Sequence, residues 1–272
     1  MKSYSQGTSP DEGQGGILLF YALPGAGKTT IAILETEKVA EPLFFANFDR
    51  SASHLLARYK GTKYYYDRFH AGNKEEALDC LERLGLMRQA ALQAGHGVFS
   101  VDNGLAFWDI VKLAFLPKQS SGEPLPKEFA DANSYIRDFL LGLEESGLWI
   151  IITAPASQVW VGAKTAMDMY SPDGWKHQDY HYLAAVELFC RTAPGPALEE
   201  LNRYGLWRPL GGRLAPVQSD EAMFQFTYHG QITSAKRRPV AQGQIMDNPT
   251  LLKVLMVLKE LKVPSVPAPD GG

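Results

Sequence analysis

The chain has 272 residues, of which 45% are apolar and 21% charged, and a net charge of -3 at pH 7. These values allow one sizeable hydrophobic core and argue against a second full domain. They also exclude a basic field over the whole protein, so any contact with nucleic acid has to come from local basic loops.

The N-terminal segment, residues 1–15, is polar and lacks the apolar centre of a signal peptide. No run of about 18 apolar residues, the length of a membrane-spanning helix, occurs in the chain. Cys80 and Cys190 lie far apart in the sequence, which suits buried free thiols in a reducing compartment. We therefore expect a soluble, cytoplasmic protein with no membrane partner and with flexible tails at residues 1–15 and 263–272.

Residues 16–34 predict a strand, a phosphate-binding loop and a helix that runs to residue 39. The spacing G-x-x-x-x-G-K-[ST] is met from position 22 to position 29, except that Ala22 replaces the first glycine. Two glycines allow successive backbone N–H groups to face a polyphosphate. The predicted ligands are ATP and Mg²⁺, and the predicted binding residues are Pro24, Gly25, Ala26, Gly27, Lys28, Thr29 and Thr30.

Lys28 is expected to reach the β- and γ-phosphates, and Thr29 to ligate Mg²⁺. The alternative is a glycine-rich turn between a strand and a helix that binds no ligand. The agreement of strand, spacing, Lys-Thr pair and helix favours the nucleotide site.

Apolar runs that alternate with helical patterns continue along the chain, which is typical of a parallel α/β sheet. We predict a strand over residues 42–49 that ends at Asp49, followed by a short helix. Residues 63–69 are β-prone, and residues 73–95 have the apolar spacing of an amphipathic helix.

The next short apolar run ends at Asp102 and is typical of a Walker B strand. A carboxylate at the end of a strand beside a phosphate loop supplies the hard oxygen ligand that Mg²⁺ requires, so Asp102 and Thr29 are the predicted metal ligands. A further buried strand, residues 148–155, places Thr153 where a polar residue can sense the nucleotide or simply cap the strand.

The order of these pieces, with a basic segment near the end of the chain, resembles RecA-like ATPases over residues 16–262. It looks most like the compact phage RecA-like proteins linked to single-strand annealing and recombination. The resemblance implies an α/β fold, a RecA-like P-loop NTPase with a mostly parallel central sheet flanked by helices and a late β-hairpin. Its one highly specific motif is the phosphate loop.

By this resemblance Asp49 stands where RecA proteins carry a catalytic glutamate and would orient the attacking water; otherwise it caps the helix that follows. Residues 224–244 suggest two strands with a turn at His229 and Gly230, ending in a basic cluster. Lys236 and Arg238 resemble the basic residues that reach a neighbouring subunit's γ-phosphate, which implies a ring or filament. The alternatives are a solvated basic turn or a nucleic-acid contact.

RecA-like proteins bind single strands through two loops, and the matching regions here are residues 116–129 and 154–178. In the second region Trp160 and Trp175 could stack on bases, and Lys164 and Lys176 could contact phosphates. The alternative is that these aromatic side chains pack against the protein itself.

The sequence thus predicts an ATP-hydrolysing RecA-like protein that assembles with itself and acts on single-stranded DNA in phage-type recombination, annealing or replication. It would work in the host cytoplasm if it is phage-encoded. Two alternatives stay open: a nucleotide-gated assembly or packaging accessory factor without DNA-stimulated turnover, and a small-metabolite P-loop kinase, whose lid arginines would be Arg203, Arg208 and Arg213.

Overall fold

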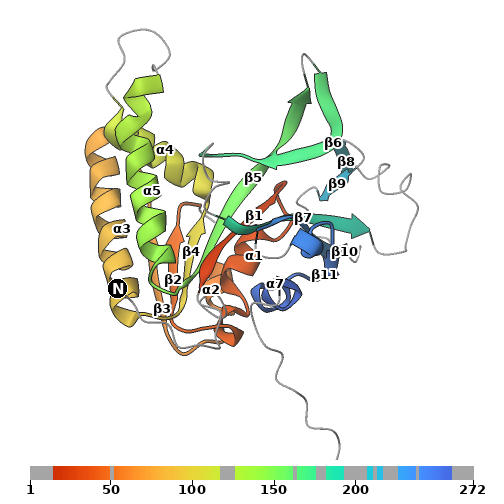
Figure 1. Cartoon of the computed structure of the whole chain (residues 1–272), viewed down its shortest axis with the longest axis horizontal. Helices are drawn as coiled ribbons and strands as arrows, with labels where there is room; N and C mark the ends of the chain where they lie inside the picture. Colours follow the sequence, from red (N-terminus) through yellow and green to blue (C-terminus); the bar gives the residue numbers. More distant parts are fainter. Residues whose placement is uncertain are drawn as a thin grey trace, which may run out of the picture.

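The computed structural model describes residues 15–49, 52–116, 126–161, 164–175, 182–192, 207–210, 213–216, 226–236 and 239–258. Within these ranges the chain forms a nine-stranded sheet in the order β11-β10-β7-β1-β5-β4-β2-β3, with β6 paired to β5. A separate two-stranded sheet joins β8 to β9. The fold is therefore mixed α/β with a mostly parallel central sheet flanked by helices, which confirms the predicted fold class (Figure 1).

The strands are β1 (Gly16–Ala22), β2 (Leu43–Asn47), β3 (Tyr64–Arg68), β4 (Val98–Asp102), β5 (Trp149–Val161), β6 (Lys164–Pro172), β7 (Tyr182–Thr192), β8 (Trp207–Leu210), β9 (Arg213–Pro216), β10 (Phe226–Ala235) and β11 (Ile245–Asp247). The helices are α1 (Lys28–Ile33), α2 (Ser53–Leu56), α3 (Lys74–Ala94), α4 (Gly104–Phe115), α5 (Ala130–Glu144) and α7 (Leu251–Leu258). Three short 3-10 helices are η1 (Thr36–Lys38), η2 (Pro126–Phe129) and η4 (Pro239–Ala241).

The strands β1, β2 and β4, and β5 as far as Ala154, are buried on both faces, because helices cover the sheet on each side. Helices α3, α4 and α5 pack on one face, here called the α3 face, with Ile17 and Leu19 of β1. Helices α1, α2 and α7 pack on the other, the α1 face, with Leu18 and Phe20. This explains why the central strands are continuous apolar runs without polar alternation.

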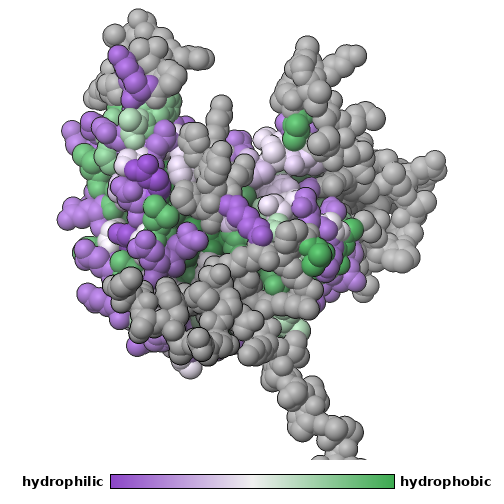
Figure 2. All heavy atoms as spheres, in the orientation of Figure 1, coloured by the Kyte–Doolittle hydropathy of each residue, from purple (hydrophilic) through white to green (hydrophobic). Residues whose placement is uncertain are grey.

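The outer surface of the helices has the opposite character. Figure 2 shows hydrophilic side chains over much of α3 and α5, with smaller hydrophobic patches between them. Among the described residues, no helix combines the length and the apolar character that crossing a membrane demands.

Two predicted boundaries differ from the structure. The helix expected to run to residue 39 ends at Ile33, because Leu34 is extended at ψ 138° and Glu35 adopts a left-handed φ of 65°. The turn expected at His229 and Gly230 is absent, since both residues lie inside β10, which pairs with β7 and with β11. The late hairpin is instead formed by β10 and β11.

The loop predicted over residues 154–178 is also largely wrong. Strand β5 continues to Val161, and β6 returns antiparallel to it, with Trp160 opposite Thr165. The β-branched and aromatic residues of this segment favour strand formation once a partner strand is available.

Candidate functional site

The loop that follows β1 has the conformation that its glycines allow. Gly25 and Gly27 both lie in the left-handed region, with φ of 82° and 89°. A side chain at either position would be strained, so these two glycines set the path of the chain into α1. Pro24, Gly25 and Thr30 are exposed, whereas Ala26 is buried against the core on the α1 face. The predicted loop residues are therefore contiguous at the carboxyl end of β1.

Lys28 folds back over this loop. Its Nζ donates hydrogen bonds to the carbonyl oxygens of Ala22, at 3.0 Å, and Leu23, at 3.2 Å. Burial lowers the pKa of Lys28, and the nearby carboxylates of Asp102 and Asp49 act in the opposite direction. The ammonium group is thus held at the loop by backbone carbonyls that an anionic ligand can replace.

A row of polar side chains lies along the carboxyl ends of the neighbouring strands. Asn47 of β2 is opposite Asp102 of β4 in the parallel register, and Thr153 lies at the same level of β5, which continues beyond this point. Strand alternation places all three on the α1 face, where Ser100 Oγ donates to the carbonyl of Ala32 in α1, at 2.8 Å. The row is buried, with Asn47, Asp102 and Thr153 at most 1% exposed.

Within this row the two oxygens of Asp102 differ. The Thr153 hydroxyl donates a hydrogen bond to Oδ1, whereas Oδ2 is buried with no hydrogen-bond partner. The Thr29 hydroxyl lies near enough to lower the pKa of Asp102, although its geometry is not that of a hydrogen bond. Burial is the larger effect and raises the pKa of Asp102 above its ordinary value.

The unpartnered Oδ2 of Asp102 and the nearby Thr29 hydroxyl are two hard oxygens of the kind that Mg²⁺ prefers. Nucleotide phosphates would supply further oxygens to the same ion. In the described part of the chain no group of three or more His, Cys, Asp or Glu side chains could hold a metal ion. Mg²⁺ commonly takes one or two protein ligands and fills its shell with phosphate and water oxygens, so Asp102 and Thr29 are enough protein ligands for the predicted ion.

Asp49 follows β2 and is exposed at the same edge of the sheet. Its backbone N–H donates to Asn47 Oδ1, at 2.9 Å, and its carboxylate acts electrostatically on both Lys28 and Asp102. Ala52 is the N-cap residue of α2, and it makes no side-chain cap hydrogen bond. Asp49 therefore lies near the loop, and a role for it in capping α2 stays a prediction.

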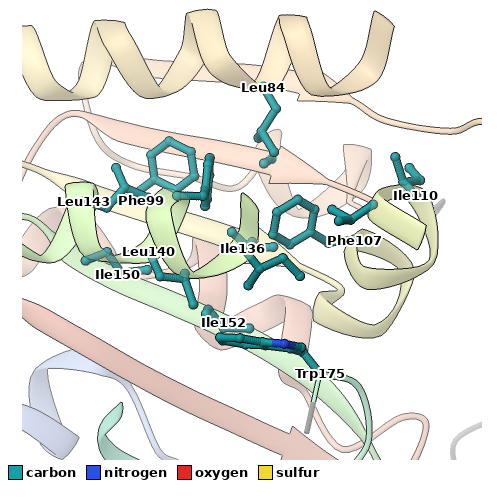
Figure 3. Packing of buried hydrophobic residues seen from close by; sticks show 14 of the residues in the cluster. Leu84, Phe99, Phe107, Ile110, Ile136, Leu140, Leu143, Ile150, Ile152 and Trp175 are labelled. Carbon is teal, nitrogen blue, oxygen red and sulfur yellow. The ribbon is translucent and has the colours of Figure 1, made fainter. Parts of the chain in front are cut away.

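The structure describes the residues predicted to contact nucleic acid only in part. Trp175 is buried at 6% exposure, packs beside Ile152 in the core and donates from Nε1 to Asn133 Oδ1 of α5, at 2.8 Å (Figure 3). A ring so enclosed offers no open face to a base, so the expectation for Trp175 is corrected to a packing role. The structure describes only the backbone of Trp160 and Lys164, in the β5–β6 hairpin, and Lys176 lies outside the described residues.

The predicted basic residues at the end of β10 are described only in part. Lys236 is exposed, and its backbone N–H donates to the Leu183 carbonyl of β7, at 2.9 Å. It follows β10, which is two strands away from β1 in the sheet order. Arg238 lies outside the described residues.

Asn47 and Ser100 are members of the site that the sequence analysis missed. Asn47 is the single polar residue of the strand LFFAN, and Ser100 stands between apolar residues in VFSVD, two residues before Asp102. A buried polar residue among apolar neighbours needs a hydrogen-bond partner, and this was the available signal.

No protein-family model matches the sequence, and a search of curated proteins returns no match. Among solved structures, the chain is similar to a KaiC-like protein from the hyperthermophilic archaeon Pyrococcus horikoshii OT3. The sequence identity is 14% and the TM-score 0.43, over 86% of this chain and 85% of that one. It is also similar to the RadB recombinase, with 11% identity and a TM-score of 0.43, over 87% of each chain. Both TM-scores are below 0.5, so neither likeness carries an argument about function.

Proposed function

We propose that this chain is a RecA-like P-loop ATPase that binds ATP with Mg²⁺ and hydrolyses it. The observation that carries the proposal is the convergence, at one edge of the sheet, of the glycine loop, the Lys28 ammonium and the unpartnered Oδ2 of Asp102 beside Thr29. A Mg²⁺ ion would give Asp102 Oδ2 a partner, and a polyphosphate would give the Lys28 ammonium an anionic partner in place of the loop carbonyls.

In the proposed nucleotide complex, Lys28 leaves the carbonyls of Ala22 and Leu23 and binds the phosphates. Thr29 and Asp102 would hold Mg²⁺, which neutralises charge on the phosphate oxygens. Thr153 keeps Asp102 in place through its hydrogen bond to Oδ1. Successive N–H groups of the loop face the anion, because Gly25 and Gly27 permit that path.

Hydrolysis requires a water molecule in line with the bond to the leaving phosphate. Asp49 is the acceptor available for this water, since its carboxylate is exposed and close enough to act on Lys28 and Asp102. Asn47 positions it by accepting a hydrogen bond from its backbone N–H. Lys236 or Arg238 of a neighbouring copy would stabilise the charge that develops on the phosphoryl group.

The proposal includes self-assembly and action on single-stranded DNA in recombination, annealing or replication. Both parts rest on the resemblance of the motif order to RecA-like ATPases. The burial of Trp175 removes one of the four residues first assigned to the DNA contact, and leaves Trp160, Lys164 and Lys176 as candidates.

The test is steady-state ATP hydrolysis with and without a long single-stranded DNA, together with binding of a fluorescent ATP analogue in the presence and absence of Mg²⁺. Lys28→Ala should abolish binding or turnover, whereas Lys38→Ala is the matched control, because Lys38 is exposed and pairs with Glu35. Full activity of Lys28→Ala would remove the proposed site. Turnover that ignores DNA would keep the ATPase and shift its role to a nucleotide-gated assembly factor or a metabolite kinase.

A further inference from the structure

Strand β3 forms one edge of the central sheet and carries three consecutive exposed tyrosines. Among the described strands it pairs only with β2. Tyr64, Tyr65 and Tyr66 are 49%, 42% and 38% exposed, although each is an amphipathic side chain that could have packed inward. The edge is far in the sheet order from the β10–β11 end, and no step of the proposed hydrolysis uses it.

Each of the three rings contacts a neighbouring aromatic ring, Tyr64 through an edge contact with Tyr59 at 5.9 Å between centroids. Tyr65 stacks on Phe44 with a centroid distance of 4.7 Å and an interplanar angle of 4°, and Phe44 belongs to the core of the α3 face. Tyr66 stacks on Phe45, at 6.2 Å, on the α1 face. Because side chains alternate along a strand, Tyr64, Tyr66 and Arg68 share the α1 face, and Tyr65 is on the opposite one.

The chain segment that carries this edge is basic, although the Glu41 carboxylate lies beside it and accepts hydrogen bonds from Thr62. Residues 58–68 contain four basic residues and one acidic residue, in a protein of net charge -3. Arg58, Lys60, Lys63 and Arg68 are exposed, and within the described ranges none of them forms an ion pair. The one acid, Asp67, is neutralised by Arg83 at 2.5 Å.

An edge lysine alone would be explained as a device against pairing with a strand of another molecule. Three exposed aromatic rings have the opposite effect, so that explanation does not account for the surface. Aromatic faces beside unpaired cations are the combination that binds bases and phosphates together. Bases inside a duplex are already stacked on each other, so only a single strand offers faces to such rings.

We propose that the α1-face side of the β3 edge binds single-stranded nucleic acid, with Tyr64 and Tyr66 stacking on bases and Lys60 and Arg68 contacting phosphates. Residues two apart on one strand are separated by about 6.6 Å, so the two rings take different bases of an extended strand. Stacking in this manner tolerates any base, because every base has a π-face.

The surface is connected to the nucleotide site through one side chain. Asn47 Nδ2 donates to the Tyr66 hydroxyl, at 3.2 Å, and Asn47 Oδ1 accepts from the Asp49 backbone N–H, at 2.9 Å. A base on Tyr66 can therefore bias the position of Asp49. This coupling rests on the proposed ATPase function, whereas the binding surface itself does not.

The experiment is a titration of fluorescein-labelled oligothymidine with the full chain, without nucleotide, followed by anisotropy over a series of salt concentrations. The double variant Tyr64→Leu/Tyr66→Leu should bind at least about fivefold more weakly. This factor corresponds to the loss of one stacked base at the lower limit of the usual stacking energy. The double variant Lys60→Gln/Arg68→Gln should lower the slope of log K against log salt by about 1.4, which is two single-strand phosphate contacts.

The matched controls lie on the same strand and on a distant helix. Tyr65→Leu removes a ring from the opposite face of β3 and should leave affinity unchanged, as should Lys112→Gln, whose lysine pairs with Asp109 of α4. Tyr66→Phe keeps the ring and removes only the hydroxyl that accepts from Asn47, so it separates stacking by the ring from an effect of that hydrogen bond.

The proposal is overturned if the wild type does not bind the oligonucleotide at low salt, or if the leucine and glutamine variants bind as tightly as the wild type. A loss of self-association in the tyrosine variants, with unchanged oligonucleotide affinity, would identify the edge as a contact between copies of the chain. ATP-analogue binding by the same variants separates the two proposals, because failure of the ATP site leaves this titration intact.

Discussion

At the scale of single residues, Asp102 combines a buried carboxylate with an oxygen, Oδ2, that has no hydrogen-bond partner. It is buried, its pKa is raised by that burial, and only one of its oxygens accepts a hydrogen bond. A raised carboxyl pKa means that the ionised form costs free energy in the folded state. The ionised Asp102 carboxylate therefore does not stabilise the nucleotide-free fold, and its environment fits the proposed role as a metal ligand.

Asp102→Asn should consequently stabilise the nucleotide-free protein, by on the order of 1 kcal/mol, because it removes a buried charge and keeps the shape of the side chain. The same variant should lose the stabilisation that ATP with Mg²⁺ gives to the wild type. Urea denaturation with and without the nucleotide measures both effects. Asp109→Asn, at an exposed pair with Lys112, is the control and should change neither quantity; a destabilised Asp102→Asn protein would contradict the interpretation.

Tyr59 gives a residue-scale test of pH dependence. Burial and the nearby Glu41 carboxylate raise its pKa from 10.0 to about 12. The folded state therefore keeps the phenolic proton more strongly than the unfolded state, so stability is fully present below pH 10 and falls as the pH rises toward 12.

Tyr59→Phe should reduce this alkaline loss, and it should cost little near pH 7, since the Tyr59 hydroxyl is buried without a hydrogen-bond partner. The free energy of unfolding, measured by urea denaturation below pH 10 and again between pH 10 and 12, should diverge from that of the wild type only in the upper range. Tyr135, whose pKa is also raised to about 12, is present in both proteins and cancels in the comparison. Parallel pH profiles would show that Tyr59 does not titrate as described.

At the scale of elements, the parts that the sequence predicted well are those fixed by local pattern. Strands β1, β2 and β4 are apolar runs with turn residues at their ends, and α3 begins where the Asn73 side chain accepts from Glu76 N–H, at 2.9 Å. The glycine loop after β1 and the end of β4 at Asp102 lie where the spacing and the ends of the apolar runs predicted them. These features depend on residues close together in the chain.

The parts that were missed depend on distant partners. The β5–β6 hairpin needs pairing across the segment for which the sequence predicts a loop. Strand β10 pairs with β7, which ends more than 30 residues earlier in the chain. Trp175 stood in that segment with the features of a base-stacking residue. Its burial could not be inferred from the sequence, because the groups that cover it, including Asn133, come from α5.

Trp175→Ala should therefore act on stability rather than on DNA affinity. Removing a buried indole from the core cluster should lower the free energy of unfolding by about 3–5 kcal/mol. Trp175→Phe keeps most of the apolar contact and loses the hydrogen bond to Asn133, so its loss should be about 1 kcal/mol. Urea denaturation gives both values, and oligonucleotide affinity of the folded Trp175→Phe protein should match the wild type. A weaker affinity in that variant would restore a nucleic-acid role for the ring.

At the scale of the whole molecule, the order of strands separates three surfaces. The nucleotide loop follows β1 near the middle of the sheet, the tyrosine surface lies at the β3 edge, and Lys236 follows β10 toward the other edge. In the proposed self-assembly, a head-to-tail arrangement would bring different faces of successive copies together, so that the site of one copy is completed by the next.

If Arg238 acts on the neighbour's γ-phosphate in this way, its loss and the loss of Lys28 affect different halves of one shared site. Arg238→Ala should keep ATP-analogue binding and lose turnover, and Lys28→Ala should lose binding. In an equal mixture, an intact site forms wherever the loop of an Arg238→Ala copy meets the Arg238 of a Lys28→Ala copy, which is about a quarter of randomly formed interfaces.

Steady-state hydrolysis across a series of mixing ratios should thus pass through a maximum near equal amounts, at roughly a quarter of the wild-type rate. Each variant mixed with wild type serves as the control, because it establishes that the variant still assembles. A rate that follows the average of the two separate variants at every ratio, with assembly intact, would mean that Arg238 acts within its own subunit or not at all. The nucleotide site would then need no second copy of the chain, and head-to-tail assembly would not be required for hydrolysis.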